Sequence, residues 1–127
     1  MATHKKIKQQ KILIVEDEHP IAKTLELKLS NSGYLVHWAE NGKDALELLH
    51  KDSVDLILLD LVMPEMDGFA MLLELKKQKK VPPIIILTNL GQEDDAKKCM
   101  DLGACEYFIK AETPLVDIVD HVSRILS

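Results

Sequence analysis

The chain has 127 residues, of which 46% are hydrophobic and 29% charged, so it can bury one hydrophobic core. Its net charge is −5, and four lysines precede the first acidic residue, Glu16, so the body of the chain is more acidic than this total. The acidic body argues against nucleic-acid binding, and no apolar run approaches the roughly 18 residues that a membrane span needs. The two cysteines show no metal-ligand spacing.

Five short segments predict β-strands. Four are continuous apolar runs, over residues 12–15, 56–59, 84–87 and 107–109, and a fifth, over residues 34–38, is weaker. Side chains that are apolar at successive positions are typical of parallel strands that helices cover on both faces.

Helical patterns follow each of these segments. Apolar residues recur every three or four positions, and the fourth helical segment ends before Gly103, a good residue for a helix stop. We expect Thr113 to cap the last helix, with Pro114 at its first position. Strand and helix alternate five times, which predicts a doubly wound α/β domain around a parallel sheet.

Polar side chains follow four of the strands. In open parallel sheets, functional side chains gather beyond the carboxyl ends of the strands. The residues at these ends are Glu16 and Asp17 after the first strand, Asp60 after the third, Thr88 after the fourth and Lys110 after the fifth. Any one of them alone would more often be an ordinary loop residue, and we interpret Glu18 in that way, as a loop residue or helix cap. Their coincidence predicts a functional site.

The three carboxylates of this set predict a metal site. Glu16, Asp17 and Asp60 would repel one another unless a cation lay between them. Mg²⁺ prefers oxygen ligands, and Mn²⁺ would also fit. A carboxylate can act as a nucleophile and form an acyl phosphate, and a metal with Lys110 would supply the charge neutralisation that phosphoryl transfer needs. The Thr88 hydroxyl can donate a hydrogen bond to a phosphoryl oxygen.

Three segments resemble the receiver domains of two-component response regulators, in particular the single-domain, chemotaxis-type regulators. Residues 11–18, KILIVEDE, resemble the acidic first strand and loop of that family. Residues 60–68, DLVMPEMDG, resemble its phosphoacceptor motif, and residues 103–110, GACEYFIK, resemble its G-A-x-x-Y-x-x-K segment. The resemblance implies a (βα)5 flavodoxin-like fold over residues 11–127, with strand order 2-1-3-4-5 and helices on both faces. Residues 1–10 would form a basic, flexible tail.

The resemblance also implies a role for each site residue. Asp60 would be the phosphoacceptor and a metal ligand. Glu16, Asp17 and the backbone carbonyl of Val62 would complete the protein's share of the metal site, with Asp17 the more direct acidic ligand. Thr88 and Tyr107 would form a switch pair, in which Thr88 moves toward the phosphoryl group and Tyr107 rotates inward. Lys110 would contact the phosphoryl group.

A phosphorylation-activated signalling switch is the function that follows from this resemblance. A histidine kinase or phosphotransfer protein would donate the phosphoryl group in a magnesium-dependent reaction in the cytoplasm. The chain would be no enzyme beyond its own phosphorylation and slow dephosphorylation. Its output would pass through the surface of the fourth helix, fifth strand and fifth helix, to a downstream protein or a second copy, without nucleic acid or membrane contact.

Two positions depart from the family pattern. Asn89 stands where the family favours a small residue, and Ala111 stands where it has proline after a cis bond. A cis bond before alanine costs about 2.5–4 kcal/mol, so we predict a trans bond between Lys110 and Ala111. Val62, Asn89 and Leu90 are expected to modulate the dephosphorylation rate, because Val62 and Leu90 would flank the attacking water without orienting it. Slow dephosphorylation is the prediction.

The sequence disfavours two other functions and leaves further ones open. A nucleotide- or flavin-binding domain would need a glycine-rich loop where residues 16–20 read EDEHP. A phosphatase with an aspartyl nucleophile would need a second acid at position 62, which is Val. An interaction module that is never phosphorylated remains open, as does a receiver cut from a larger DNA-binding regulator or hybrid kinase. Trp38 and Met71 are interpreted as packing residues.

Overall fold

The structure is a computed structural model that describes residues 9–127. Eight residues of the predicted basic tail, 1–8, lie outside the described residues. The other two contact the domain: the side-chain amide of Gln9 donates to the carbonyl of Gly33, and that of Gln10 donates to the carbonyl of Leu126.

Five parallel strands form one sheet in the order β2-β1-β3-β4-β5, which confirms the predicted fold. The strands are β1 (Lys11–Val15), β2 (Leu35–Ala39), β3 (Leu56–Leu59), β4 (Ile84–Thr88) and β5 (Glu106–Ile109). The helices are α1 (His19–Asn31), α2 (Gly42–Lys51), α3 (Gly68–Lys76), α4 (Glu93–Asp101) and α5 (Leu115–Leu126), with a 3₁₀ turn, η1 (Lys110–Glu112), before α5.

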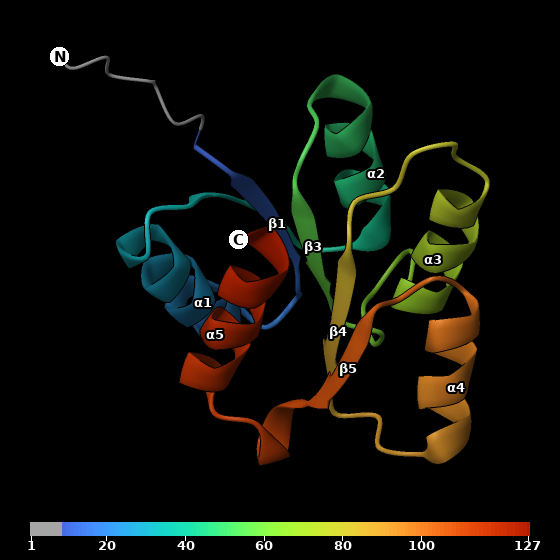
Figure 1. The fold of residues 1–127 in the computed structure, drawn as a ribbon. Helices are drawn as coiled ribbons and strands as arrows, with labels where there is room; N and C mark the ends of the chain where they lie inside the picture. The colour runs from blue at the N-terminus through green and yellow to red at the C-terminus, as the bar shows by residue number, and fades with distance from the viewer. Residues whose placement is uncertain (1–8) are drawn as a thin grey trace, which may run out of the picture.

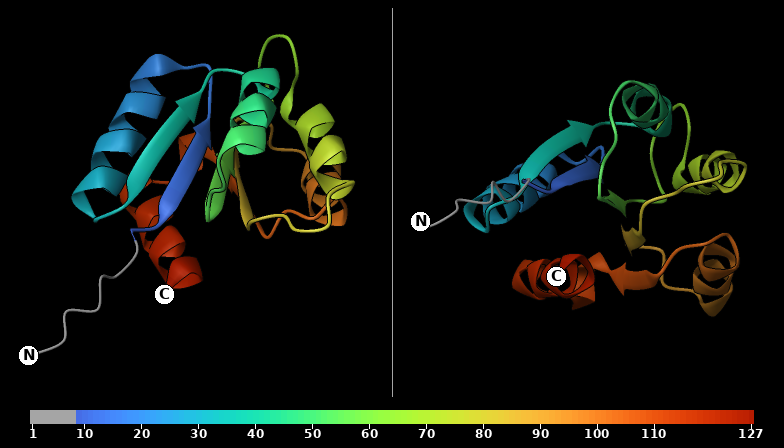
Figure 2. Two further views of the ribbon diagram at one scale, coloured as in Figure 1. Left: turned by 90° about the horizontal axis from the view of Figure 1, so that it is seen from above. Right: turned by 45° about the horizontal axis from the view of Figure 1, so that its top comes forward.

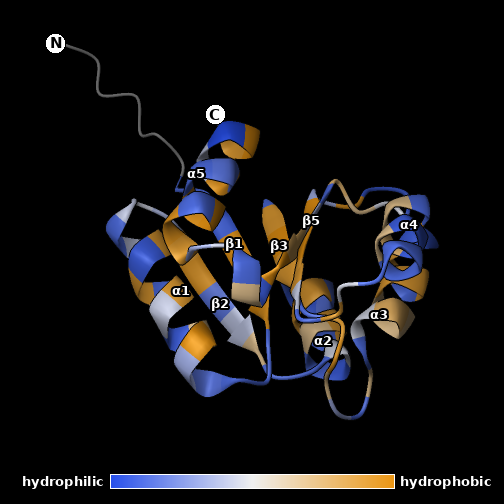
Figure 3. Ribbon diagram, turned by 90° about the horizontal axis from the view of Figure 1, so that it is seen from below, coloured by the Kyte–Doolittle hydropathy of each residue, from blue (hydrophilic) through white to orange (hydrophobic). Residues whose placement is uncertain are grey.

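Helices cover both faces of the sheet (Figures 1 and 2). Successive side chains of a strand point to opposite faces, so Leu13 and Val15 pack under α2, α3 and α4, whereas Ile12 and Ile14 pack under α1 and α5. This two-sided burial explains why the strands are apolar at successive positions. Figure 3 shows the result, an apolar sheet between helices with polar outer faces. Among residues 9–127, no helix combines the length and apolar character needed to cross a bilayer.

The start of α5 differs from the prediction. The helix begins at Leu115, and Pro114 precedes it in an extended conformation without a side-chain cap. Thr113 instead closes η1, where its amide donates to the carbonyl of Lys110. The predicted Thr113 cap is therefore wrong, because α5 begins one residue later than expected: Thr113 still belongs to the turn that starts at Lys110, and Pro114 stands at the capping position. The stop of α4 is as predicted, since Gly103 has a φ of 106°.

Candidate functional site

The predicted site residues lie beyond the carboxyl ends of the strands, along one side of the sheet that is called the Asp60 edge below (at the bottom of Figure 1). β1 and β3 are neighbours in the sheet, so the residues that follow them are close in space. One carboxylate oxygen from each of Glu16, Asp17 and Asp60 lies within 4.8 Å of the others. Among the described residues this is the one group of three or more acidic, histidine or cysteine side chains with such spacing.

Asp60 is held by hydrogen bonds to both of its carboxylate oxygens. Oδ1 accepts from the amide of Leu61 at 2.7 Å and from that of Val62 at 3.3 Å, and Oδ2 accepts from Lys110 Nζ at 2.9 Å. The side chain is 5% exposed. Gly68 permits this arrangement, because a Cβ at that position would lie 2.7 Å from the Cα of Leu61. The amides orient the carboxylate without neutralising its charge, so Lys110 carries that task.

Lys110 is buried between two carboxylates. Its Nζ lies 2.6 Å from Glu16 Oε1 as well as 2.9 Å from Asp60 Oδ2, and its side chain is 7% exposed. Burial alone would lower the pKa of Lys110, but the two carboxylates outweigh burial and raise it. Burial raises the pKa of Glu16 to about 7, and the charge of Asp60 adds to this effect while Lys110 opposes it. The site therefore holds more negative charge than one lysine balances.

Asp17 faces the solvent at the rim of a small hollow of about 200 Å³. Asp60, Val62, Asn89 and Lys110 line the same hollow, together with Glu18. The Glu18 carboxylate lies 3.8 Å from Lys110 Nζ and makes no capping hydrogen bond to α1, although Glu18 occupies the capping position. Exposed residues line this hollow, so a hydrated ion or a phosphoryl group can reach Asp60 from solvent.

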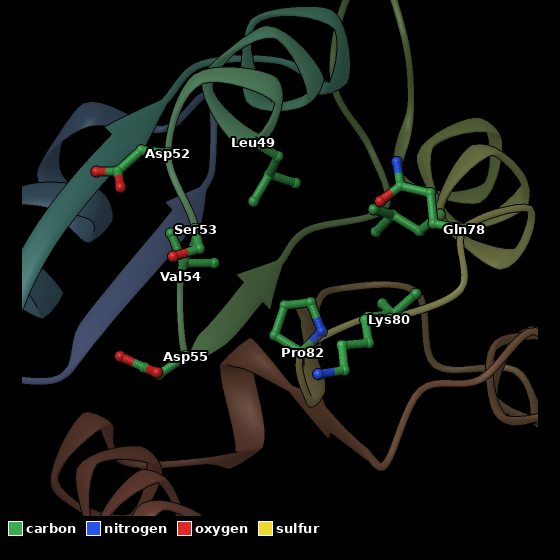
Figure 4. A pocket seen from close by; sticks show the side chains of 10 residues that line it. Leu49, Asp52, Ser53, Val54, Asp55, Gln78, Lys80 and Pro82 are labelled. Atoms are coloured by element: carbon green, nitrogen blue, oxygen red, sulfur yellow. The ribbon is translucent and has the colours of Figure 1, made fainter.

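The second hollow of note lies at the opposite edge of the sheet, where β3 and β4 begin (Figure 4). It measures about 410 Å³, and its lining residues include Leu49, Asp55, Lys80 and Pro82. It is larger than the hollow at Asp60, but none of its described residues belongs to a group of side chains with metal-ligand spacing. The chemistry of the chain is concentrated at the Asp60 edge.

Thr88 and Tyr107 connect the site with the loop between β4 and α4. Thr88 is fully buried, and its hydroxyl accepts a hydrogen bond from the amide of Leu90 at 3.4 Å. The Tyr107 ring packs against the core under α2, α3 and α4, and its hydroxyl donates to the carbonyl of Leu90. Burial raises the pKa of Tyr107 to about 12, so this hydroxyl remains a donor at neutral pH.

The predicted rate-modulating residues are divided between two environments. Val62, with 57% exposure, and Asn89 line the hollow at Asp60. Leu90 is half-buried and packs against the core, and its backbone serves Thr88 and Tyr107. Leu90 therefore belongs to the loop between β4 and α4 and does not line the hollow.

The model of the family described as "Response regulator receiver domain" matches residues 12–122, nearly the whole chain. The chain belongs to this family. The receiver is 42% identical over 106 residues to a "Probable transcriptional regulator ycf27" of Guillardia theta, a match that covers 84% of this chain and 41% of the relative. It spans about two fifths of the length of such curated relatives.

Solved receivers share its fold. The signal receiver domain of a signal transduction histidine kinase from Syntrophus aciditrophicus is 36% identical, with a TM-score of 0.83 over 92% of this chain and 89% of that one. The receiver domain of the Francisella response regulator 1452 is 28% identical, with a TM-score of 0.86 over 92% of this chain and 96% of that one.

The receiver departs from the family pattern at Ala111, and the structure confirms the predicted trans bond there. Residues 9–127 contain no cis peptide bond. The chain turns through η1 directly after β5, and Lys110, the first residue of that turn, still reaches Glu16 and Asp60.

One contact of the site was missed by sequence reasoning. The indole nitrogen of Trp38, in β2, donates a hydrogen bond of 2.7 Å to the backbone carbonyl of Glu16. Trp38 does pack on the core under α1 and α5, as predicted. No pattern in the sequence reveals the hydrogen bond, because it depends on the register between β1 and β2.

Proposed function

We propose that this receiver is a phosphorylation-activated signalling switch that accepts a phosphoryl group on Asp60. The observation that carries this proposal is the setting of the Asp60 carboxylate. It is oriented by two backbone amides and by Lys110, and it borders an open hollow beside two further acidic groups. A carboxylate in this setting can attack phosphorus, while the bond from phosphorus to the leaving group of the donor breaks.

The acidic residues fit a hard divalent cation. Glu16, Asp17 and Asp60 offer only oxygen, and their ligand atoms lie close enough together for one ion. We propose that they would hold Mg²⁺ or Mn²⁺, together with the backbone carbonyl of Val62. The ion would neutralise charge on the incoming phosphoryl group. Lys110 contacts the carboxylates of Glu16 and Asp60 in the structure. During the reaction it would contact a phosphoryl oxygen instead.

The output would pass through the loop between β4 and α4. A phosphoryl group on Asp60 brings additional acceptor oxygens, to which the buried Thr88 hydroxyl can donate. The sequence-based hypothesis has Tyr107 rotating inward at that point. Because the ring already lies against the core here, we propose instead that phosphorylation stabilises an arrangement that the protein already adopts.

The surface of α4, β5 and α5 is the proposed route to a partner. Tyr107 belongs to β5, and Leu90 lies in the loop between β4 and α4, so the Tyr107–Leu90 hydrogen bond joins one strand of that surface to the loop that leads into α4. The proposed donor is a phosphohistidine on a kinase or phosphotransfer protein, and the proposed compartment is the cytoplasm. Because the curated relatives are longer and include proteins named as transcriptional regulators, a role within a larger regulator is the second candidate.

Intact-mass measurement tests the primary reaction. Incubation with acetyl phosphate and Mg²⁺ should add one phosphoryl group to the wild type, and a chelator should prevent the gain. The Asp60→Asn variant should gain nothing, whereas Asp101→Asn, which alters an exposed residue at the end of α4, should react like the wild type. Equal labelling of Asp60→Asn and the wild type would refute the assignment of Asp60.

A further inference from the structure

The acidic loop, residues 16–18, is tied to the edge strand β2 on both sides of Glu16. The amide of Glu16 donates to the carbonyl of Ala39 at 3.0 Å, and the carbonyl of Glu16 accepts from Trp38 Nε1 at 2.7 Å. The first bond continues the pairing of β1 with β2. The second is a side-chain bond, at the point where the sheet pairing has ended and the chain turns toward Asp17.

The Trp38 bond fixes the orientation of the peptide unit that leads to Asp17. A peptide unit is planar, so a hydrogen bond to the Glu16 oxygen also restrains the nitrogen and Cα of Asp17. Glu16 has a second restraint, because its carboxylate contacts Lys110 and the amide of Glu18. The Asp17 carboxylate makes no hydrogen bond or ion pair with any described residue, so its position depends on the backbone that carries it.

The indole is half-buried and has neighbours on two sides. One side packs on the core under α1 and α5. The ring of His19 meets it edge-on, with 4.7 Å between the ring centroids, and His19 Nε2 lies 3.0 Å from Glu40 Oε1. A donor held on two sides has little freedom to lose when it bonds a backbone carbonyl.

From these contacts we infer that Trp38 is a positioning residue for the metal site, which acts by orienting the peptide between Glu16 and Asp17. The inference rests on the proposed function, since it takes the acidic residues to be metal ligands. The contact of Trp38 is with the backbone of Glu16 and not with the carboxylates that would bind the ion. Its effect is to set the distance at which the Asp17 carboxylate meets the other two.

Metal affinity measured by calorimetry tests this role. The Trp38→Phe variant keeps an aromatic ring but loses the N–H donor, so its Mg²⁺ dissociation constant should rise by roughly 3- to 10-fold. The matched control is Tyr34→Phe, which removes a different aromatic donor, the Tyr34 hydroxyl that contacts Ser123 Oγ at 3.2 Å. Tyr34→Phe should bind Mg²⁺ like the wild type even if both variants lose stability.

A spectroscopic test uses the wild type alone and does not depend on the folding of a variant. Trp38 is the single tryptophan of the chain, so its indole N–H gives one proton resonance. That resonance should shift as Mg²⁺ is added and should saturate at the dissociation constant that calorimetry gives. In Asp17→Asn, the same shift should require a much higher Mg²⁺ concentration.

Different results would contradict the role of Trp38 and the metal site itself. A normal Mg²⁺ affinity in Trp38→Phe, with weakened binding in Asp17→Asn, would overturn the role of Trp38 and leave the metal site intact. An indole resonance that does not respond to saturating Mg²⁺ in the wild type would overturn it as well. Unchanged binding in Asp17→Asn would refute the metal site, and the role of Trp38 with it.

Discussion

Replacing Lys110 by methionine isolates the charge balance of the site. The substitution keeps much of the apolar stem but leaves the carboxylates of Glu16 and Asp60 buried without the ammonium that contacts them at 2.6 and 2.9 Å. Breaking a buried ion pair from one side costs about 3–5 kcal/mol. Glu16 can relieve part of this by binding a proton, because its pKa is already about 7 with Lys110 present. We therefore expect a loss of about 2–3 kcal/mol in the metal-free protein at pH 7.

The size of this loss should depend on pH. The folded pKa of Glu16 lies above its ordinary value of 4.5, so the folded state binds more protons than the unfolded state between these values. The free energy of unfolding then falls as pH rises, by up to about 1.4 kcal/mol per pH unit. In the wild type this fall should end near pH 7. Without Lys110 the folded pKa rises further, so the gap between the two proteins should widen by about 1 kcal/mol from pH 7 to pH 8.

Urea unfolding followed by circular dichroism, with a chelator at pH 6, 7 and 8, measures this difference. The matched control is Lys77→Met, which removes an ion pair with Glu74 of similar length, 3.0 Å, but with the lysine side chain 72% exposed. That variant should lose about 0–1 kcal/mol at every pH. A loss below about 1 kcal/mol in Lys110→Met that does not change with pH would show that Lys110 does not balance the buried carboxylates.

Three further variants test neighbouring features. Val62→Asn places a hydrogen-bonding group at the rim of the hollow, where it can orient the attacking water. The phosphorylated variant should therefore lose its phosphoryl group several-fold faster than the wild type. An unchanged decay rate would count against the proposal that water reaches Asp60 past Val62. Tyr107→Phe removes the hydrogen bond to the Leu90 carbonyl, so the free energy of unfolding should fall by about 1 kcal/mol. Amide hydrogen exchange measured by NMR should be faster in residues 89–92, and unchanged exchange there would contradict the role of this bond. Gly68→Ala drives a methyl group against the backbone of Asp60 and Leu61, so urea unfolding should show a loss of about 1–3 kcal/mol, and a neutral result would mean that α3 shifts freely.

The fold was predictable because its strands are buried on both faces. A run such as Ile84, Ile85, Ile86 leaves no exposed face, so helices must cover both sides of the sheet. The two outer strands, β2 and β5, are mostly half-buried, and the signal of β2 in the sequence was the weakest. Periodicity carries no information on the strand order, because the pairing of β1 with both β2 and β3 leaves no mark on the local pattern. Family resemblance supplied the order instead.

The membership of the site was predictable for a different reason. Parallel strands all end at one edge, so a residue that follows a strand is placed there whatever the details of packing. The orientation of the side chains was harder to predict from the sequence. The hypothesis that Tyr107 rotates inward on phosphorylation did not anticipate the position seen here, where the half-buried ring already packs against the core with its hydroxyl on the Leu90 carbonyl. The two positions of such a ring differ by side-chain rotation, and both are compatible with the same sequence and the same strand.

The peptide bond between Lys110 and Ala111 shows what the local energy of a bond can predict and what it cannot. A trans bond was predicted because a cis bond before alanine costs a few kcal/mol, and the backbone of this receiver agrees. That argument gave no account of how the lysine would then reach the site. The structure supplies it: Lys110 is the first residue of η1, so the chain turns immediately after β5 while the lysine stem extends toward Glu16 and Asp60. The same turn extends to Thr113, whose amide donates to the Lys110 carbonyl, and α5 begins only at Leu115, so Pro114 and not Thr113 stands at its capping position. The successful prediction at Ala111 and the failed one at Thr113 therefore have a single physical origin, the turn that positions the lysine.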